Sequence, residues 1–433
     1  MITLKIHAFK KNQKMVRALL YILASFPDRY RIRNMNGKWE AEEREERTMK
    51  DFYFRMLTRI RYGIGISGNV AEFCKEQNGT KVFLMADKIL QENHVLDPIL
   101  KSFEDAGMEY VVFTDVVPEP PVDVVDRVSE VMKTSGCDIC VSIGGGSTID
   151  TAKAVCMLQT NEGSVKDYLF GGSRTVTNPS VPLICIPTTA GTGAEVTAAS
   201  VIDDTENKVK LSVTHENLIP GLALLDPTLQ ESLPPSVTAT TGMDALTHAI
   251  ESYVSLNSNP IGDAYGLQTM RMIGANLRNA VANGADMEAR GNMIIASLLG
   301  GAAILNCGLG VVHGIAQSIG GIAHVPHGLA NALILPYAME INYVGNLEKF
   351  KNIAVCLGEN VEGLSLRDAA ARSVKAIVDL ENDIGIPRKL SEVGVTRDMF
   401  PQIIEDTMAY RLLAINPIKI TRQHVEGILE AAY

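Results

Sequence analysis

Tryptophan and long apolar runs are scarce in this chain of 433 residues, which contains a single tryptophan. No apolar run approaches the roughly 20 residues needed to span a bilayer, so we expect no membrane span. Acidic residues (50) outnumber lysine and arginine (40), and the formal net charge is −10. An acidic chain repels phosphate backbones and anionic lipid, so neither nucleic acid nor a membrane surface is an expected partner.

Cysteine is too sparse and scattered to indicate a disulfide framework. The seven cysteines lie mostly inside apolar runs, which favours a reduced, cytoplasmic setting. Cys137 and Cys140 form a C-x-x-C, but no second pair follows at zinc-site spacing, and we interpret them as core residues. We expect no signal peptide, because Arg17 interrupts the apolar stretch near the N-terminus and no small-residue cleavage site follows.

The first 52 residues differ in composition from the rest. Basic residues outnumber acids by nine to one over residues 1–38, and acids crowd together over residues 40–46. We expect residues 1–52 to be an extension that is either disordered or not normally translated, with Met49 as the true start in the second case. Mass spectrometry of protein expressed from its native locus tests this, since an intact N-terminus at Met1 rules out the later start.

Short β-rich runs alternate with helical stretches between about residues 53 and 234. The runs are almost continuously apolar, which is typical of parallel strands buried on both faces. The pattern therefore predicts a Rossmann-like α/β domain with a parallel sheet. The expected strands are Lys81–Asp87, Tyr110–Val116, Asp138–Gly144, Pro182–Thr188, Lys208–Val213 and Leu222–Leu225, and the clearest helices between them are Gln91–Ala106 and Val122–Thr134.

Long periodic segments rich in Ala, Leu, Ile, Met and Glu follow, such as Ser236–Ser255 and Gly262–Ala282. The double proline at 234–235 marks a boundary, because proline fits inside neither flanking element. We therefore expect two domains, as the chain length also favours: an α/β domain at 53–234 and an all-helical domain at 235–433.

Glycine-rich segments are the candidates for binding a phosphate. The literal G-x-G-x-x-G at Gly63–Gly68 precedes the first clear predicted strand, so we expect a turn leading into a helix near Asn69–Glu76. The segment Gly144–Lys153 follows a predicted strand and opens a helix, where amides bind anions and Ser147 can cap the helix. A plain tight turn is the alternative. A second loop, Pro187–Thr197, follows the next strand, and the two loops would line one crevice.

Asp87 closes the first predicted strand. An acid at the C-terminal end of such a strand accepts hydrogen bonds from a ribose diol and repels a 2′-phosphate, which favours NAD over NADP. Taken alone, the residue is equally well explained as a helix N-cap.

One aspartate and three histidines form a candidate metal site. Asp244 and His248 are four residues apart in a predicted helix and share one face, although such a pair alone is more often simply exposed. His313 and His327 each precede a glycine in apolar surroundings, where an imidazole needs a partner for each nitrogen. This set suits Fe(II), Zn(II), Co(II) or Ni(II) better than Mg or Ca. His324 either points into the cleft or supports its loop, and we do not count it as a ligand.

Together these motifs resemble the iron-containing (group III) alcohol dehydrogenases, from about Phe54 to the end of the chain. The resemblance implies a dehydroquinate synthase-like architecture, with a Rossmann-like N-terminal domain and a helical C-terminal domain. The motifs are GGGS-x-x-D-x-x-K at Gly144–Lys153, PTTAGTG-x-E-V-T at Pro187–Thr197, D-A-L-T-H-A-x-E at Asp244–Glu251, and Pro326-His327-Gly328.

The resemblance also implies a reaction and its cofactors. A divalent metal, Fe(II) or Zn(II) or another transition metal, would be held by Asp244, His248, His313 and His327. Hydride would pass reversibly between NAD(P), with NAD favoured, and a small primary alcohol or aldehyde. A homodimer or larger assembly is expected. The implied cofactor contacts are Asp87, Gly144, Gly145, Gly146, Ser147, Asp150, Thr188, Thr189, Thr192, Thr197 and Lys210.

The chain departs from the family pattern in places. Gln317 stands where many members have a histidine assigned to proton relay, and glutamine is neither acid nor base near neutral pH. Water, cofactor hydroxyls or His324 would then carry the proton, or the substrate class differs. Ala194 stands in place of a frequent serine that would contact phosphate. The alternative function is a lyase resembling dehydroquinate synthase, but the C-terminal domain lacks the basic cluster that its substrate needs.

Overall fold

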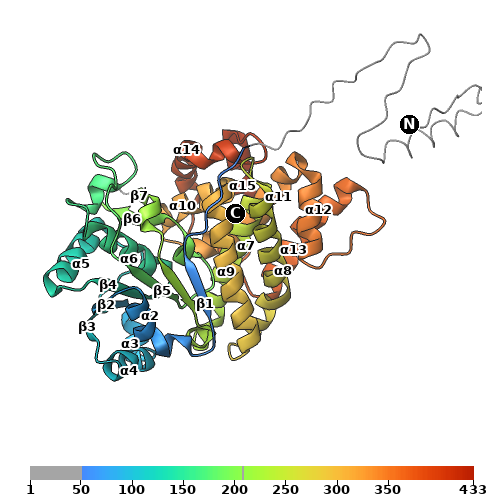
Figure 1. Ribbon diagram of the computed structural model, residues 1–433. Helices are drawn as coiled ribbons and strands as arrows, with labels where there is room; N and C mark the ends of the chain where they lie inside the picture. The colour runs from blue at the N-terminus through green and yellow to red at the C-terminus, as the bar shows by residue number, and fades with distance from the viewer. Residues whose placement is uncertain (1–50, 207–208) are drawn as a thin grey trace, which may run out of the picture. The chain divides into compact units, whose positions relative to one another are not determined.

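The computed structural model of this protein describes residues 51–206 and 209–433, so the expectation for residues 1–50 lies outside the described residues. Residues 53–433 form one compact unit. Within it, all described strands precede residue 226, and only helices with their connecting loops follow residue 234 (Figure 1).

Six parallel strands form the main sheet, in the order β1-β8-β5-β4-β2-β3. The predicted parallel sheet is therefore confirmed. Gly144 at the end of β4 lies opposite Pro187 at the end of β5, which places the two glycine loops at one edge. The strands are β1 (Arg59–Tyr62), β2 (Lys81–Ala86), β3 (Glu109–Phe113), β4 (Ile139–Gly144), β5 (Leu183–Pro187) and β8 (Leu222–Leu225).

Helices cover both faces of this sheet (Figure 1). Val82 and Leu84 of β2 pack with α2 and α4, whereas Phe83 and Met85 pack with α5 and α6. Alternate residues point to opposite faces, so burial on both faces explains why these strands are continuous apolar runs. The helices of this half are α2 (Val70–Glu76), α3 (Lys88–Glu92), α4 (Asp97–Asp105), α5 (Val122–Ser135) and α6 (Gly146–Leu158).

The segment Lys208–Val213 does not finish the main sheet, so that part of the sequence prediction is wrong. Its described part belongs to β7 (Val209–Thr214), which pairs antiparallel with β6 (Ala199–Asp204) in a separate two-stranded sheet. Buried residues of β6 alternate with more exposed ones. That alternation is typical of a half-buried strand and not of a strand inside the parallel sheet.

Two other elements differ from the prediction. Strand β1 was not predicted, because its four residues, RIRY, are all exposed and two are arginine. The expected helix Gln91–Ala106 is two helices, α3 and α4. They are separated at His94, whose left-handed φ of 58° interrupts a right-handed helix.

The G-x-G-x-x-G segment at Gly63–Gly68 leads through a short 3-10 helix into α2, as the expected turn should. Strand β1 does precede it, so its place in the chain alone does not exclude a phosphate loop. The amides of Gly65 and Ser67 donate to the carboxylate of Asp226 at 3.0 and 3.1 Å. An internal carboxylate thus takes the donors that a phosphate would need.

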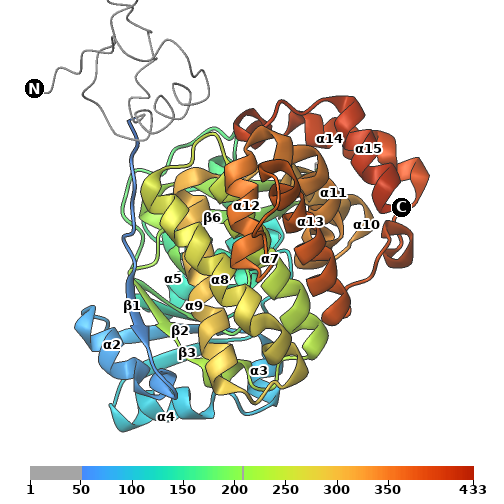
Figure 2. The same ribbon diagram turned by 90° about the vertical axis from the view of Figure 1, so that its right-hand side faces the viewer.

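The helical half packs around one apolar core, which Ala190, Val196, Ala223 and Leu225 of the α/β half join. Helices α8 and α9 run side by side along it (Figure 2). Among the described residues no single helix is long and apolar enough to cross a membrane, and α9 and α10 reach that level only as a pair bent by 106°. The helices are α7 (Pro235–Val254), α8 (Pro260–Ala282), α9 (Met287–Cys307), α10 (Val311–Ala323), α11 (His327–Asn342), α12 (Leu347–Cys356), α13 (Leu366–Asp383), α14 (Phe400–Ala409) and α15 (Arg422–Ala432).

All seven cysteines lie in the described residues and are free. Cys140 is buried in the core beside α5 and α6, and Cys137 accepts a hydrogen bond from the hydroxyl of Ser135 at 3.3 Å. The interpretation as core residues is confirmed for Cys140, whereas Cys137 is only partly buried and packs against that core.

Candidate metal centre and nucleotide site

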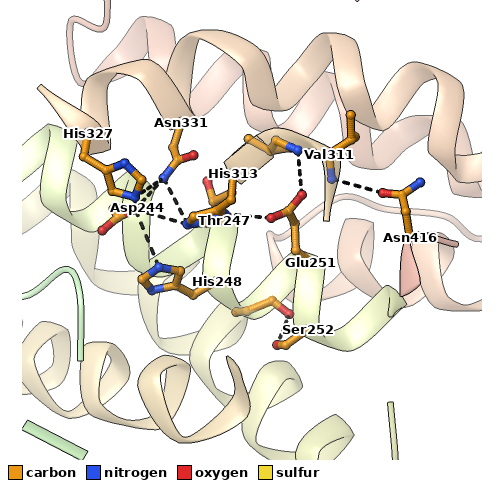
Figure 3. A network of polar contacts seen from close by, with 12 residues as sticks. Asp244, Thr247, His248, Glu251, Ser252, Val311, His313, His327, Asn331 and Asn416 are labelled. Carbon is orange, nitrogen blue, oxygen red and sulfur yellow. Dashed lines mark hydrogen bonds and ion pairs between the residues drawn. The ribbon is translucent and has the colours of Figure 1, made fainter. Parts of the chain in front are cut away.

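The four predicted metal ligands come together from three helices (Figure 3). Asp244 and His248 lie one turn apart on α7, His313 lies in the first turn of α10, and His327 begins α11. Asp244 Oδ1 lies 3.7, 3.8 and 3.7 Å from the Nε2 atoms of the three histidines, in chain order. Gly328 lets α11 begin this close to α7, because a Cβ atom there would lie 2.4 Å from a backbone oxygen of α7.

Burial and neighbouring side chains together set the protonation states of Asp244 and His248. Asp244, His248 and His313 are buried, whereas the side chain of His327 is 42% exposed. Burial lowers the pKa of His248 to about 4, so its imidazole is neutral near neutral pH. Burial opposes ionisation of Asp244, but the neighbouring histidines and Asn331 outweigh it and lower the pKa of that carboxyl. An ionised carboxylate and neutral imidazoles are the forms that bind a metal.

The donor set fits a divalent transition metal. One ligand atom from each of Asp244, His248 and His313 lies within 4.8 Å of the others. Imidazole nitrogens with one carboxylate oxygen suit Fe(II) or Zn(II). The exposed side of His327 leaves one face of the group open, as a site that also receives a substrate requires.

A buried glutamate, which the sequence did not reveal as functional, orients one of these histidines. Glu251 Oε2 accepts from Nδ1 of His313 at 2.6 Å, which directs Nε2 of that ring toward the aspartate. Glu251 Oε1 accepts from the amide of Val312 at 2.7 Å, and Asn416 accepts from the amide of Val311 at 3.2 Å, so both cap the start of α10 (Figure 3). The signal in the sequence is its spacing of seven from Asp244, two turns along one helix face.

Asn331 is a second residue that the sequence did not reveal. It lies one turn after His327 on α11, is fully buried, and points its amide into the ligand group (Figure 3). Its Nδ2 lies 2.7 Å from Asp244 Oδ1 and 3.1 and 3.2 Å from the Nε2 atoms of His313 and His327. Its spacing of four from His327 is the signal that places it on the same face.

The two glycine loops lie side by side at the carboxyl ends of β4 and β5. The amide of Thr188 donates to the carbonyl of Gly144 at 3.0 Å. A Cβ atom on Gly146 would lie 2.7 Å from the side chain of Thr192, so only glycine allows this approach. Helix α6 begins in the first loop, and its first amides are suited to an anion such as a pyrophosphate.

The second glycine loop, Pro187–Thr197, packs against helices of the helical half, including α7, which carries two of the metal ligands. A Cβ atom on Gly191 would lie 2.9 Å from Thr241, which precedes Asp244 by one turn on α7. Gly193 has a left-handed φ of 60°, and a Cβ atom there would lie 2.6 Å from Gly301 of α9. The approach at Gly191 sets the loop within one helical turn of Asp244, and the approach at Gly193 packs it against α9.

Asp87 lies at the glycine turn, and Ser147 does not cap the helix as expected. Asp87 occupies the N-cap of α3 without a capping hydrogen bond. It accepts from the hydroxyl of Thr148 at 2.5 Å and from the amide of Gly145. Burial raises its pKa, and both hydrogen bonds oppose this rise.

Gly145 holds the N-cap of α6 without a side chain to offer, and Ser147 instead accepts from the amide of Glu119 at 3.3 Å.

Several predicted cofactor contacts have partners within the protein. Lys153 is fully buried, donates to Thr197 at 2.9 Å, and lies 3.5 Å from Asp150. Lys210 forms an ion pair with Glu119. Asp150 and Thr197 thus help to hold α6 against the second loop and β6, and contact of any of these residues with a cofactor stays a prediction.

The expected relay position carries no acid or base. Gln317 lies one turn after His313 on α10, and its side chain forms no hydrogen bond with the part of the chain that the structure describes. His324 follows the end of α10 in a left-handed conformation with φ 54° and is exposed. Burial raises the pKa of Asp203, the charges of Lys210 and His324 oppose this rise, and that of Glu119 adds to it, so these groups share one region.

Comparison with known proteins places the chain in a family. Residues 58–227 match the model described as "Iron-containing alcohol dehydrogenase", and residues 238–433 match "Fe-containing alcohol dehydrogenase family, C-terminal". The 1,3-propanediol dehydrogenase of Klebsiella pneumoniae is 41% identical over 366 residues, 84% of this chain and 94% of that protein. The NAD-dependent methanol dehydrogenase of Bacillus methanolicus is 37% identical over 370 residues, 86% of this chain and 97% of that protein.

A solved structure agrees with this assignment. The crystal structure of 1,3-propanediol oxidoreductase matches with a TM-score of 0.86 at 39% identity, covering 89% of this chain and 100% of that chain. The chain therefore belongs to the iron-containing alcohol dehydrogenase family. It is an oxidoreductase, and nothing in these comparisons favours the lyase alternative.

Proposed function

We propose that this protein transfers hydride between NAD and a small primary alcohol or its aldehyde, at a metal held by Asp244, His248, His313 and His327. The observation that carries the proposal is the convergence of one carboxylate oxygen and three imidazole nitrogens. The loop Pro187–Thr197 packs against Thr241, one helical turn before the ligand Asp244. The relatives named 1,3-propanediol dehydrogenase and NAD-dependent methanol dehydrogenase support small primary alcohols as the substrate class.

A bound divalent metal supplies Lewis-acid polarisation of the substrate oxygen, and NAD supplies the hydride exchange. The protein holds both in place. The first amides of α6 bind the pyrophosphate, and the open side of His327 admits the substrate. Gln317 cannot transfer a proton near neutral pH, so we assign proton release to water or to His324.

An activity panel tests this function. Protein stripped of metal and reloaded with Fe(II) or Zn(II) is assayed with a series of alcohols and aldehydes and with NAD(H) and NADP(H). We expect net NADH turnover only in the reloaded protein. Full activity after stripping would refute the metal centre. Consumption of a phosphorylated sugar acid without net NADH turnover would favour the lyase.

Asp87 should set the preference for NAD. The change Asp87→Asn keeps an acceptor for the hydroxyl of Thr148 and removes the negative charge that repels a 2′-phosphate. A like charge about 4 Å from a phosphate is worth about 1.5 to 3 kcal/mol, so the ratio of kcat/KM for NADP to that for NAD should rise about 10-fold to 100-fold. Steady-state kinetics with both cofactors measures the ratio.

Asp138→Asn is the matched control for this variant. Asp138 also accepts hydrogen bonds, from Thr80 and Lys81, but it precedes β4 and lies at the opposite end of that strand from the glycine turn. Its loss should lower stability and leave the cofactor ratio unchanged. An unchanged ratio in Asp87→Asn would show that this carboxylate does not face the ribose.

We further propose a cytoplasmic homodimer or larger homo-oligomer. The free cysteines support the location. Strand β1 is an edge strand that pairs only with β8 among the described residues, and Tyr53, Ile60, Tyr62 and Ile64 are exposed on or beside it. An open edge with exposed apolar side chains is suited to pairing with a second copy. Light scattering after size exclusion tests this, and a monomer at micromolar concentration would contradict it.

A further inference from the structure

The amide of Asn331 contacts the same atoms that the proposed metal would bind. Its Nδ2 lies 2.7 Å from Asp244 Oδ1, 3.1 Å from His313 Nε2 and 3.2 Å from His327 Nε2. The side chain is fully buried, and Figure 3 shows its nitrogen joined by dashed lines to the ligand group. The two N–H groups of one neutral side chain can therefore satisfy two of the proposed ligands at once.

The chemistry of the neighbours fixes which end of this amide faces them. The carboxylate of Asp244 only accepts hydrogen bonds. His313 uses its Nδ1 hydrogen on Glu251, so its Nε2 is also an acceptor. The NH₂ group must therefore face the ligands, which leaves Oδ1 of Asn331 buried with no hydrogen-bond partner among the described residues.

A metal and this amide compete for the same lone pair. Each imidazole Nε2 that accepts a hydrogen bond has a single lone pair in the ring plane, which binds either a donor hydrogen or a metal ion. We propose that Asn331 is an internal occupant of the metal site: its two N–H groups donate to Asp244 and His313, beside His327, in the metal-free protein, and the amide is displaced when the ion binds. The proposal rests on the ligand set of the proposed function.

This occupant gives the metal-free chain a way to bury its aspartate. A buried carboxylate without donors is costly, and the Asn331 amide is the side chain that donates to Asp244 here. Stabilising the metal-free form lowers the affinity for the metal by the same factor, because both follow from one thermodynamic cycle. Asn331 would thus raise the stability of the metal-free protein and lower its affinity for the metal. The bound metal would then exchange more readily.

The substitution Asn331→Leu tests this, because leucine has a similar size and no donor. Zinc affinity is measured by competition with a chromogenic chelator, and melting temperatures are measured with and without zinc. The variant loses the hydrogen bond that Asn331 donates to charged Asp244 in the metal-free form. We therefore expect it to bind zinc about tenfold more tightly or more, and to have a lower melting temperature only without metal. Asn331→Ala, which adds no bulk, should change both quantities in the same direction.

Asn161→Leu is the matched control. Asn161 is also buried and hydrogen-bonded, but its partners lie at residues 157–178 of the α/β half. It should destabilise both forms equally and leave zinc affinity unchanged. Weaker or unchanged zinc binding in both Asn331 variants would overturn the inference, while failure of the wild-type protein to bind zinc or Fe(II) would overturn the metal site itself.

Discussion

His248→Ala should lose its metal and its activity together. The change removes one of four ligands and leaves Asp244 with two histidines, one of which is half exposed. Losing the Lewis acid removes several kcal/mol of transition-state stabilisation, so kcat/KM should fall by at least about 10³-fold. Two quantities are measured on the same preparation: the metal content after desalting, by mass spectrometry, and kcat/KM with an active alcohol.

The fold should survive this change. His248 Nδ1 has no hydrogen-bond partner among the described residues, so its removal leaves no donor or acceptor newly unpaired there. Its ring stacks on His313 with centroids 4.9 Å apart, and the loss of that packing should lower stability without changing the fold. His94→Ala, at an exposed histidine of the α/β half, is the control and should keep both metal and activity. Retention of metal by His248→Ala would contradict the ligand assignment.

The parallel sheet could be predicted because its strands carry an unusual pattern. Strands such as β2 and β4 are buried on both faces, and burial on both faces produces apolar runs without polar alternation. Strand β1 has no such pattern, since it lies at the sheet edge with all its residues exposed. Whether β7 joins the main sheet or pairs with β6 depends on contacts between distant segments, which local patterns do not determine.

The metal ligands could be predicted because their chemistry is rare. Asp244 and His248 share a helix face, and His313 and His327 are histidines in apolar surroundings; neither observation is specific alone, but together they indicate one site. Asn331 does not stand out, since a helical asparagine is ordinary until its partners are known. Ser147 misled for a related reason: a serine near a helix start commonly caps it, but the turn here places glycine at the capping position.

Glu251 couples the start of α10 to the orientation of a metal ligand. One carboxylate oxygen accepts from the amide of Val312 at 2.7 Å, and the other accepts from Nδ1 of His313 at 2.6 Å. The proton therefore stays on Nδ1, and Nε2 keeps its lone pair for the metal. A carboxylate can accept both hydrogen bonds, and no neutral side chain of the same size can.

Glu251→Gln should weaken metal binding without removing the helix cap. If the oxygen of the introduced glutamine accepts from the amide of Val312, the glutamine NH₂ group faces Nδ1 of His313. That nitrogen must then be an acceptor. The ring proton then moves to Nε2, the atom proposed to bind the metal. Loss of such an orienting partner typically costs 10-fold to 100-fold in metal affinity, and we expect a fall of about that size, measured by chelator competition.

Asn416→Ala separates this orienting role from simple capping. Asn416 caps the same helix through the amide of Val311 but has no hydrogen bond to His313. Through loss of a cap, Asn416→Ala should clearly lower the melting temperature and change metal affinity little. Glu251→Gln should clearly lower metal affinity and change the melting temperature little, because it retains one capping acceptor and reverses the imidazole tautomer of His313. If the two variants lose metal affinity equally, Glu251 acts only by holding the helix start, and the tautomer of His313 is set by something else.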